Sequence, residues 1–309
     1  MKYRDWLIQW LNIYIKPTMK EKTYVQYSNI VRLHLVPALG NKDISDLTPM
    51  VVQQFITQKL ESGNIKNGKG LSPNTVNLII AVMQSSLEMA HAFGIISEYS
   101  MGKIKRPKIK EKKIECFTKE EQKKIEQYVL KDKRDKMNGI LLCLYTGIRI
   151  GELLALEWSD IDLKKSEMTI NKTCHDGKNE KGRFCRITNL PKTDSSLRTI
   201  PVPIQLLPIL KELKKKSVCN YVIADGTQYI SVRSYQRSFE LLQKKLKISH
   251  HGFHALRHTF ATRAIENGMD VKSLSEILGH KSPAITLKRY VHSLMDHKKS
   301  MMNKLGKML

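Results

Sequence analysis

Apolar residues in the first hundred positions recur every three or four residues, which is the spacing of amphipathic helices. Helix-start patterns divide these positions into segments. Thr18 and Glu21 have the spacing of a capping box, and the Thr-Pro pair at 48–49 and the Ser-Pro pair at 72–73 each place a capping residue before a proline suited to a first helical turn. The helices that follow the two proline pairs each run to a glycine. This pattern predicts an all-helical first domain over residues 1–102.

The apolar pattern changes twice in the second part of the chain. Thr118 and Glu121 form another capping-box pattern before a helix, and a further apolar helical run ends at Gly147. Three short runs rich in β-branched residues then follow, separated by polar turns: EMTINKTC, RFCRIT and LRTIPVP. They predict a small three-stranded antiparallel sheet, after which helical patterns return. The second domain, residues 114–309, is therefore predicted to be mainly helical.

Composition narrows the choice of partner more than the choice of fold. The 309 residues include 53 Lys and Arg against 29 Asp and Glu, a formal net charge of +24. Such an imbalance favours phosphate-rich polymers first and membrane surfaces second. No apolar run approaches the roughly 18 residues of a membrane span, and the N-terminus lacks a signal-peptide pattern, so a cytosolic location is expected. The five scattered cysteines disfavour a disulfide scaffold, a zinc site and a redox motif.

A basic stretch without apolar periodicity separates the two predicted domains. Residues 103–113 read KIKRPKIKEKK and include seven basic residues, one acidic residue and one proline. Because no face of this stretch could be buried, we interpret it as an extended linker. A solvated connector and a segment that contacts DNA both remain open, and the net charge of the chain favours contact.

Two segments of the second domain combine arginine with groups suited to anion binding. Arg149 directly precedes an apolar helix, and Glu152 lies three residues on, placed to orient it. A guanidinium at a helix N-terminus presents a fixed two-pronged donor to an anion. His254 and Arg257 are three residues apart, on one helical face. Taken alone, Arg149 also fits a surface salt bridge, and the histidine-rich segment also fits a metal site, although no carboxylate or cysteine lies nearby in the sequence.

Three further residues could complete a reactive set. Lys192 lies in the turn before the third predicted strand, where it is either an ordinary solvated lysine or a proton donor to a phosphate oxygen. The stretch ILGHKSPAITLKRYVH ends one helix at Gly279 and places His280 in the turn. A short helix that begins at the following Ser-Pro pair carries Tyr290. A tyrosine in such a helix is usually a half-buried packing residue, so its neighbours decide its role.

Together these segments resemble the tyrosine recombinase (phage-type integrase) family. The family's motifs match, in order, an arginine in TGIRIGEL, a lysine in PKT, histidine-x-x-arginine in HALRHTFAT, a histidine in LGH and a tyrosine ten residues later in RYVH. The helical first hundred residues also resemble the family's core-binding domain. The match includes no counterpart of the arm-binding domain that many phage and transposon integrases carry before this point. PKTDSSLRTIPVP and the first domain look more like integrases of mobile elements, such as conjugative transposons, than like chromosomal resolution enzymes.

The resemblance implies a mainly α fold of two domains and a reaction on DNA. The domains would be a SAM-like core-binding domain and a mainly helical catalytic domain with a small three-stranded antiparallel sheet. Tyr290 would attack a DNA phosphorus to form a 3′-phosphotyrosyl link, and Lys192 would protonate the departing 5′ oxygen. Neither a metal nor a nucleotide cofactor is implied.

The remaining site residues would stabilise the reacting phosphate. Arg149, Arg257 and either His254 or His280 would bind the non-bridging oxygens. One of the histidines, His254 foremost, would take the tyrosine proton, and Glu152 would orient the set.

The resemblance also implies partners. Four protomers would act on two DNA duplexes through a Holliday junction, and the lysine-rich tail after Tyr290 would dock on a neighbouring protomer. Accessory DNA-bending or excision factors would set the direction of integration or excision. Three alternatives remain open at this stage: a type IB topoisomerase, a non-catalytic DNA-binding regulator on the same scaffold, and a basic nucleic-acid binder without chemistry.

Overall fold

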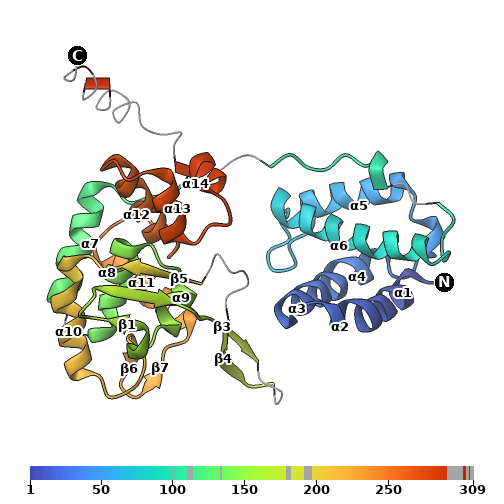
Figure 1. Cartoon of the computed structure of the whole chain (residues 1–309). Helices are drawn as coiled ribbons and strands as arrows, with labels where there is room; N and C mark the ends of the chain where they lie inside the picture. The colour runs from blue at the N-terminus through green and yellow to red at the C-terminus, as the bar shows by residue number, and fades with distance from the viewer. Residues whose placement is uncertain are drawn as a thin grey trace. The chain divides into compact units, whose positions relative to one another are not determined.

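The chain divides into two compact units, Met1–Lys112 and Lys113–Leu309, each described below by itself (Figure 1). The computed structural model describes residues 1–98, 101–109, 114–132, 134–178, 182–190, 197–290, 302–303 and 306, with the side chains of 197–290 described through Leu287. No helix of these described residues is both long and apolar enough to cross a membrane.

The described part of the first unit is helical, as predicted. Its α-helices are α1 (Tyr3–Trp10), α2 (Lys16–Thr18), α3 (Glu21–Ile30), α4 (Val36–Leu39), α5 (Pro49–Ser62) and α6 (Pro73–Ala92). Two π-helical turns, Leu11–Ile15 and Val31–Leu35, and two 3₁₀ turns, Ile44–Asp46 and Met101–Lys103, complete it. The long helix α6 supplies much of the core, since Val76, Ile79, Ile80 and Met83 on its inner face are almost fully buried. Burial of such side chains is the main favourable contribution to folding.

Two of the three predicted helix starts in this unit are confirmed. The Thr48 hydroxyl accepts a hydrogen bond from the backbone N–H of Val51 at 3.4 Å, and Ser72 caps α6 in the same way at 3.3 Å. The capping box predicted at Thr18 is wrong. Helix α3 begins only at Glu21, and the Thr18 hydroxyl instead donates to the carbonyl of Tyr14 at 2.5 Å, so it closes the preceding helix.

The second unit is mainly helical and contains small antiparallel sheets, as the fold prediction expected. Its α-helices are α7 (Lys119–Lys131), α8 (Asn138–Thr146), α9 (Ile150–Ala155), α10 (Leu207–Lys216), α11 (Val232–Lys245), α12 (Ala255–Glu266), α13 (Val271–Leu278) and α14 (Pro283–Tyr290). Its strands are β1 (Ile161–Asp162), β2 (Glu167–Ile170), β3 (Thr173–Lys178), β4 (Phe184–Asn189), β5 (Arg198–Pro201), β6 (Ala224–Asp225) and β7 (Gln228–Tyr229). In its described residues, 3₁₀ turns lie at Asp135–Met137, Trp158–Asp160 and Ile204–Leu206. The capping box at Thr118 and Glu121 forms as predicted.

The three-stranded antiparallel sheet exists, but one of its strands was predicted wrongly. Its order is β1-β2-β5, with Met168 opposite Ile200. The run RFCRIT lies instead in β4, which pairs with β3 as a separate two-stranded hairpin. The reason lies at Asn171 and Lys172, which bond to Asp160 at 2.8 Å and Glu157 at 2.7 Å and separate β2 from β3. The chain then leaves the first sheet before the hairpin begins.

Two glycines in left-handed conformation bring distant loops to one place. Gly147 ends α8 with φ 68° and Gly279 ends α13 with φ 62°. A side chain would not fit at Gly147, since a Cβ there would lie 2.4 Å from the Phe260 ring. Both conformations favour glycine because other L-residues are strained there. The two turns lead directly to Arg149 and His280.

Candidate active site

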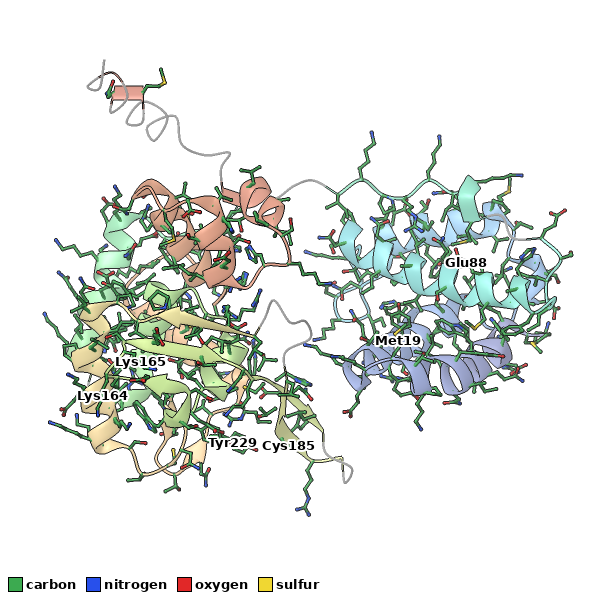
Figure 2. The ribbon with its side chains drawn as sticks, in the orientation of Figure 1. Met19, Glu88, Lys164, Lys165, Cys185 and Tyr229 are labelled. Atoms are coloured by element: carbon green, nitrogen blue, oxygen red, sulfur yellow. The ribbon has the colours of Figure 1, made fainter. Side chains whose placement is uncertain are left out.

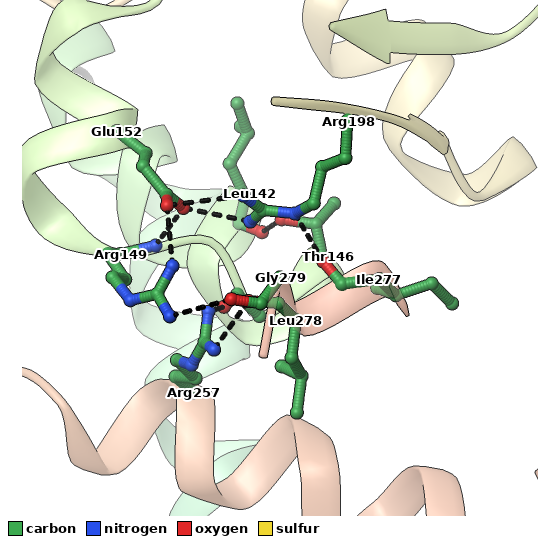
Figure 3. Close-up of polar contacts among 10 residues, drawn as sticks. Leu142, Thr146, Arg149, Glu152, Arg198, Arg257, Ile277, Leu278 and Gly279 are labelled. Atoms are coloured by element: carbon green, nitrogen blue, oxygen red, sulfur yellow. Dashed lines mark hydrogen bonds and ion pairs between the residues drawn. The ribbon is translucent and has the colours of Figure 1, made fainter. Parts of the chain in front are cut away.

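Arg149 stands at the N-terminus of α9 and is paired with Glu152, as the sequence predicted. The backbone N–H of Arg149 donates to Glu152 Oε2 at 2.9 Å, and its Nη1 donates to Oε1 at 2.7 Å. The carboxylate therefore closes the first turn of the helix and fixes the guanidinium at once. Arg149 Nη2 donates to the carbonyl of Gly279 at 3.3 Å, so the side chain also joins α9 to the turn before His280 (Figure 3).

Glu152 has a second arginine partner that the sequence analysis missed. Arg198, the first residue of β5, donates from Nη2 to Oε2 at 2.9 Å and from Nη1 to Oε1 at 3.2 Å. Burial raises the pKa of Glu152, but the hydrogen bonds and charge of Arg198, followed by Arg149, outweigh burial and lower this pKa to about 2. The buried carboxylate is therefore ionised at neutral pH.

Arg257 lies beneath the same turn and is 2% exposed. Its Nη1 donates to the carbonyl of Gly147 at 2.9 Å, and its Nη2 donates to the carbonyl of Leu278 at 2.6 Å (Figure 3). These bonds tie the turn before Arg149 to the turn before His280. Three guanidinium groups thus converge on one carboxylate and several carbonyl oxygens, which leaves the cluster with net positive charge.

The candidate histidines are held by specific neighbours. His280 Nδ1 is hydrogen-bonded to the hydroxyl of Thr286 at 2.7 Å, and Thr286 is fully buried on α14. His254 immediately precedes α12, and its ring packs edge-on against that of His258 at 4.6 Å between centroids. Because Arg257 is three residues further along, His254 and Arg257 lie on the same side of this helix. No group of three or more His, Cys, Asp or Glu residues among the described positions is arranged to hold a metal ion.

The structure describes one further predicted residue, Tyr290, only in part and another, Lys192, not at all. Lys192 lies outside the described residues. Tyr290 is the last residue of α14, the helix that follows His280, and its side chain likewise lies outside the description. The backbone therefore places Tyr290 one helical turn beyond Thr286, the partner of His280.

The sequence contains a pattern that could have indicated a buried partner for Arg198. Strand side chains alternate between faces, so Arg198 must share the face of Ile200, which is 1% exposed. An arginine on the core face of a strand needs a buried acceptor, and Glu152 is that acceptor. Thr286 has no comparable pattern, because its role depends on the tertiary position of His280.

Comparison with known proteins identifies the family. Residues 115–297 match the phage integrase family, and residues 2–60 match the phage integrase N-terminal SAM-like domain. The chain is 29% identical to the tyrosine recombinase XerC-like protein of Caldanaerobacter subterraneus subsp. tengcongensis, over 95% of this chain and 80% of that protein. It is 26% identical to the ICEBs1 integrase of Bacillus subtilis, over 94% of this chain and 79% of that protein.

Solved structures share the fold. The Tn1549 transposon integrase in complex with transposon right end DNA matches with a TM-score of 0.81 and 21% identity, covering 99% of this chain and 100% of that one. A lambda integrase tetramer bound to a Holliday junction matches with a TM-score of 0.69 and 22% identity, covering 92% and 78%. The family match extends over most of the second unit and includes the residues of the arginine cluster. The chain therefore belongs to the phage integrase family and is a site-specific tyrosine recombinase.

Proposed function

We propose that this recombinase cuts and rejoins DNA through a covalent link to Tyr290. The observation that carries the proposal is the convergence of Arg149 and Arg257 on the Leu278–Gly279 turn, next to His280 and the helix that bears Tyr290. A phosphodiester under attack gains negative charge on its non-bridging oxygens, which preorganised cationic donors stabilise.

Each site residue has a role in this proposal. The Tyr290 oxygen attacks phosphorus, a 3′-phosphotyrosyl bond forms, and the bond to the 5′ oxygen breaks. Lys192 gives its proton to that oxygen, since an ammonium can donate a proton and a guanidinium cannot. His254 takes the tyrosine proton. Because the ester retains the energy of the broken bond, another strand's 5′-hydroxyl can reverse the attack and complete an exchange.

Arg149, Arg257 and His280 bind the phosphate oxygens, and Glu152 orients Arg149. Arg149 is the most exposed of the three arginines in the cluster, with its side chain 36% exposed. The described side-chain contacts of Arg149 use one N–H of Nη1 and one N–H of Nη2. Because a guanidinium has five N–H donors, others are left to bind a phosphate. Arg257, tied to two carbonyls from below, places its charge under the same phosphate.

The two units divide the work of DNA binding. Residues 1–102 form the core-binding domain, 103–113 the basic linker and 114–309 the catalytic domain. The net charge of +24 supports extensive phosphate contact, which dominates the affinity of such proteins. The 26% identity to the ICEBs1 integrase supports integration or excision of a mobile element.

Four protomers on a Holliday junction form the proposed working assembly. The similarity to the lambda integrase, whose tetramer has been solved on such a junction, supports it. The lysine-rich tail after Tyr290 docks on the neighbouring protomer, and DNA-bending or excision factors set the direction.

A nicked duplex tests the proposed chemistry. The substrates are duplexes from the DNA that flanks the gene, each nicked near the candidate crossover. After cleavage the short fragment between the cut and the nick is lost, so the strand cannot be resealed. We expect the wild-type protein to form a denaturation-resistant protein–DNA adduct without added metal or nucleotide, and Tyr290→Phe to form none while it still binds the duplex.

Two outcomes would favour an alternative function, and a third measurement tests the assembly. No adduct with any duplex that the protein binds would support a non-catalytic regulator. Adduct formation on the nicked duplex, together with intact duplexes whose strands reseal only to their original partners, would support a topoisomerase. Native mass measurement on four-way junction DNA should give four protomers per junction, and fewer would contradict the assembly.

A further inference from the structure

Arg198 is a buried charged group next to the candidate site that the proposed chemistry leaves unused. It begins β5, pairs across the sheet with Ile170, and has a side chain that is only 7% exposed. The side chain leaves the sheet and ends between α9 and α13, against Glu152 and the carbonyl of Ile277, to which its Nε donates at 2.6 Å (Figure 3).

The contacts of Arg198 are specific to the turn that precedes His280. A Cβ on Gly279 would lie 2.9 Å from Arg198 Nη1, so this glycine is required for close approach as well as for its left-handed backbone. Arg198 also follows Lys192 by six residues in the sequence. One side chain therefore connects the strand after Lys192, the helix that begins at Arg149 and the turn at Gly279.

The charges around Glu152 show what Arg198 contributes. Each carboxylate oxygen accepts one bond from Arg149 and one from Arg198: Oε1 at 2.7 and 3.2 Å, and Oε2 at 2.9 and 2.9 Å. A buried carboxylate binds its counter-charge strongly because few water molecules screen it. Without Arg198, Arg149 would be the nearest counter-charge of the Glu152 carboxylate. Because the carboxylate would then compensate the positive charge of Arg149, the attraction of Arg149 for a phosphate would fall.

We propose that Arg198 is a positioning residue that supplies the counter-charge of Glu152, so that Arg149 stays oriented by this carboxylate but is not neutralised by it. Arg198 does not contact the DNA. It acts through Glu152 and through the Ile277 carbonyl, and it leaves the outward part of the Arg149 guanidinium for the phosphate. The inference rests on the proposed role of Arg149.

The test is a pair of linked variants measured by the rate of covalent adduct formation on the nicked duplex, per folded molecule. Arg198→Met should slow the adduct by roughly 100-fold, the scale of a misplaced catalytic group, with little change in DNA affinity. Adding Glu152→Gln to Arg198→Met removes the carboxylate charge that Arg149 alone would otherwise compensate, and it should recover at least roughly tenfold of this loss. Arg198→Lys, which keeps the charge but not the two-pronged contact, should fall between wild type and Arg198→Met.

Arg263→Met is the matched control. Arg263 is also mostly buried, pairs with Glu266 at 2.7 Å and donates to the Phe117 carbonyl at 2.9 Å, but it lies outside the cluster. It should lower thermal stability and leave the adduct rate per folded molecule unchanged. An Arg198→Met protein as fast as wild type, or a double variant no faster than Arg198→Met, would overturn the proposal. If the wild-type protein itself forms no adduct, the proposed function fails first.

Discussion

Arginine is held in two different ways in the second unit. In the hairpin β3–β4, the Arg186 guanidinium lies over the rings of Tyr221 and Tyr229, at 4.2 and 4.6 Å from their centroids, and donates to the Leu154 carbonyl at 2.7 Å. Figure 2 labels Tyr229 and Cys185, the residue before Arg186. Arg186 Nη2 is buried and has no hydrogen-bond partner among the described residues. Asp176, opposite Arg186 in the hairpin, bonds instead to the first N–H groups of α11.

The contacts described for the arginines of the candidate site are with carbonyl and carboxylate oxygens. Arg149 is held on one side by Glu152 and Gly279, and it is still about one third exposed. The aromatic rings around Arg186 enclose its charge and fasten a hairpin. The polar contacts of Arg149 fix its direction and leave charge at the surface. Under the proposed function, the difference separates an arginine that stabilises the fold from one that is prepared for an anion.

Exchanging each arginine for methionine should separate these roles most strongly. Arg149→Met should slow adduct formation by about 100-fold to 1,000-fold, which is the typical cost of removing one preorganised donor. Arg186→Met should instead lower the free energy of unfolding by about 1 to 3 kcal/mol through lost ring and carbonyl contacts. Adduct kinetics and thermal unfolding of both variants measure this.

The comparison would fail if the two variants behaved alike. A large loss of adduct rate per folded molecule in Arg186→Met would mean that the hairpin arginine also acts in the reaction.

Acid should weaken the active-site cluster through its carboxylate. The pKa of Glu152 in the folded protein is about 2, below its ordinary value of 4.5. A lowered carboxylate pKa gives stability that is complete above the ordinary value and is lost as the pH falls through the folded value. The loss should amount to about 3 kcal/mol between pH 4.5 and pH 2.

Glu152→Gln is the variant that isolates this effect. Unfolding free energies from pH 6 to pH 2 should fall less steeply in the variant than in wild type, because all other acidic groups are common to both. Parallel curves would show that the carboxylate is not held ionised by its two arginines.

The smallest effect is expected at Thr286, which holds His280 by one hydrogen bond. Thr286→Val keeps the shape of the side chain but removes the hydroxyl that bonds to His280. It should slow adduct formation by roughly tenfold, which corresponds to about 1.4 kcal/mol of activation free energy. Thr286→Ser should restore most of the rate. Equal rates for valine and serine would show that packing alone positions His280.

The sequence predicted the local contacts of the candidate site and missed the distant ones. Arg149 and Glu152 lie within one helical turn, so their pairing followed from spacing alone. Arg257 was a candidate from the sequence, but its carbonyl partners, Gly147 and Leu278, lie 110 and 21 residues away along the chain. No local pattern specifies such contacts.

The same distinction explains the fold. Most predicted helix starts were right because a cap is a contact within four residues. The sheet prediction was partly wrong because strand propensity does not determine which strand a segment pairs with. RFCRIT has the composition of a strand, and only tertiary contacts decide that it pairs with β3 and not with β2.

The central claim is that Tyr290 becomes esterified to DNA within this cationic cluster. Its most direct test is protease digestion of the adduct trapped on a nicked duplex, followed by mass spectrometry to locate the residue that carries the nucleotide. The account predicts a single modified peptide with the mass increment on Tyr290. A nucleotide on any of the other ten tyrosines, or on a different residue type, would contradict it.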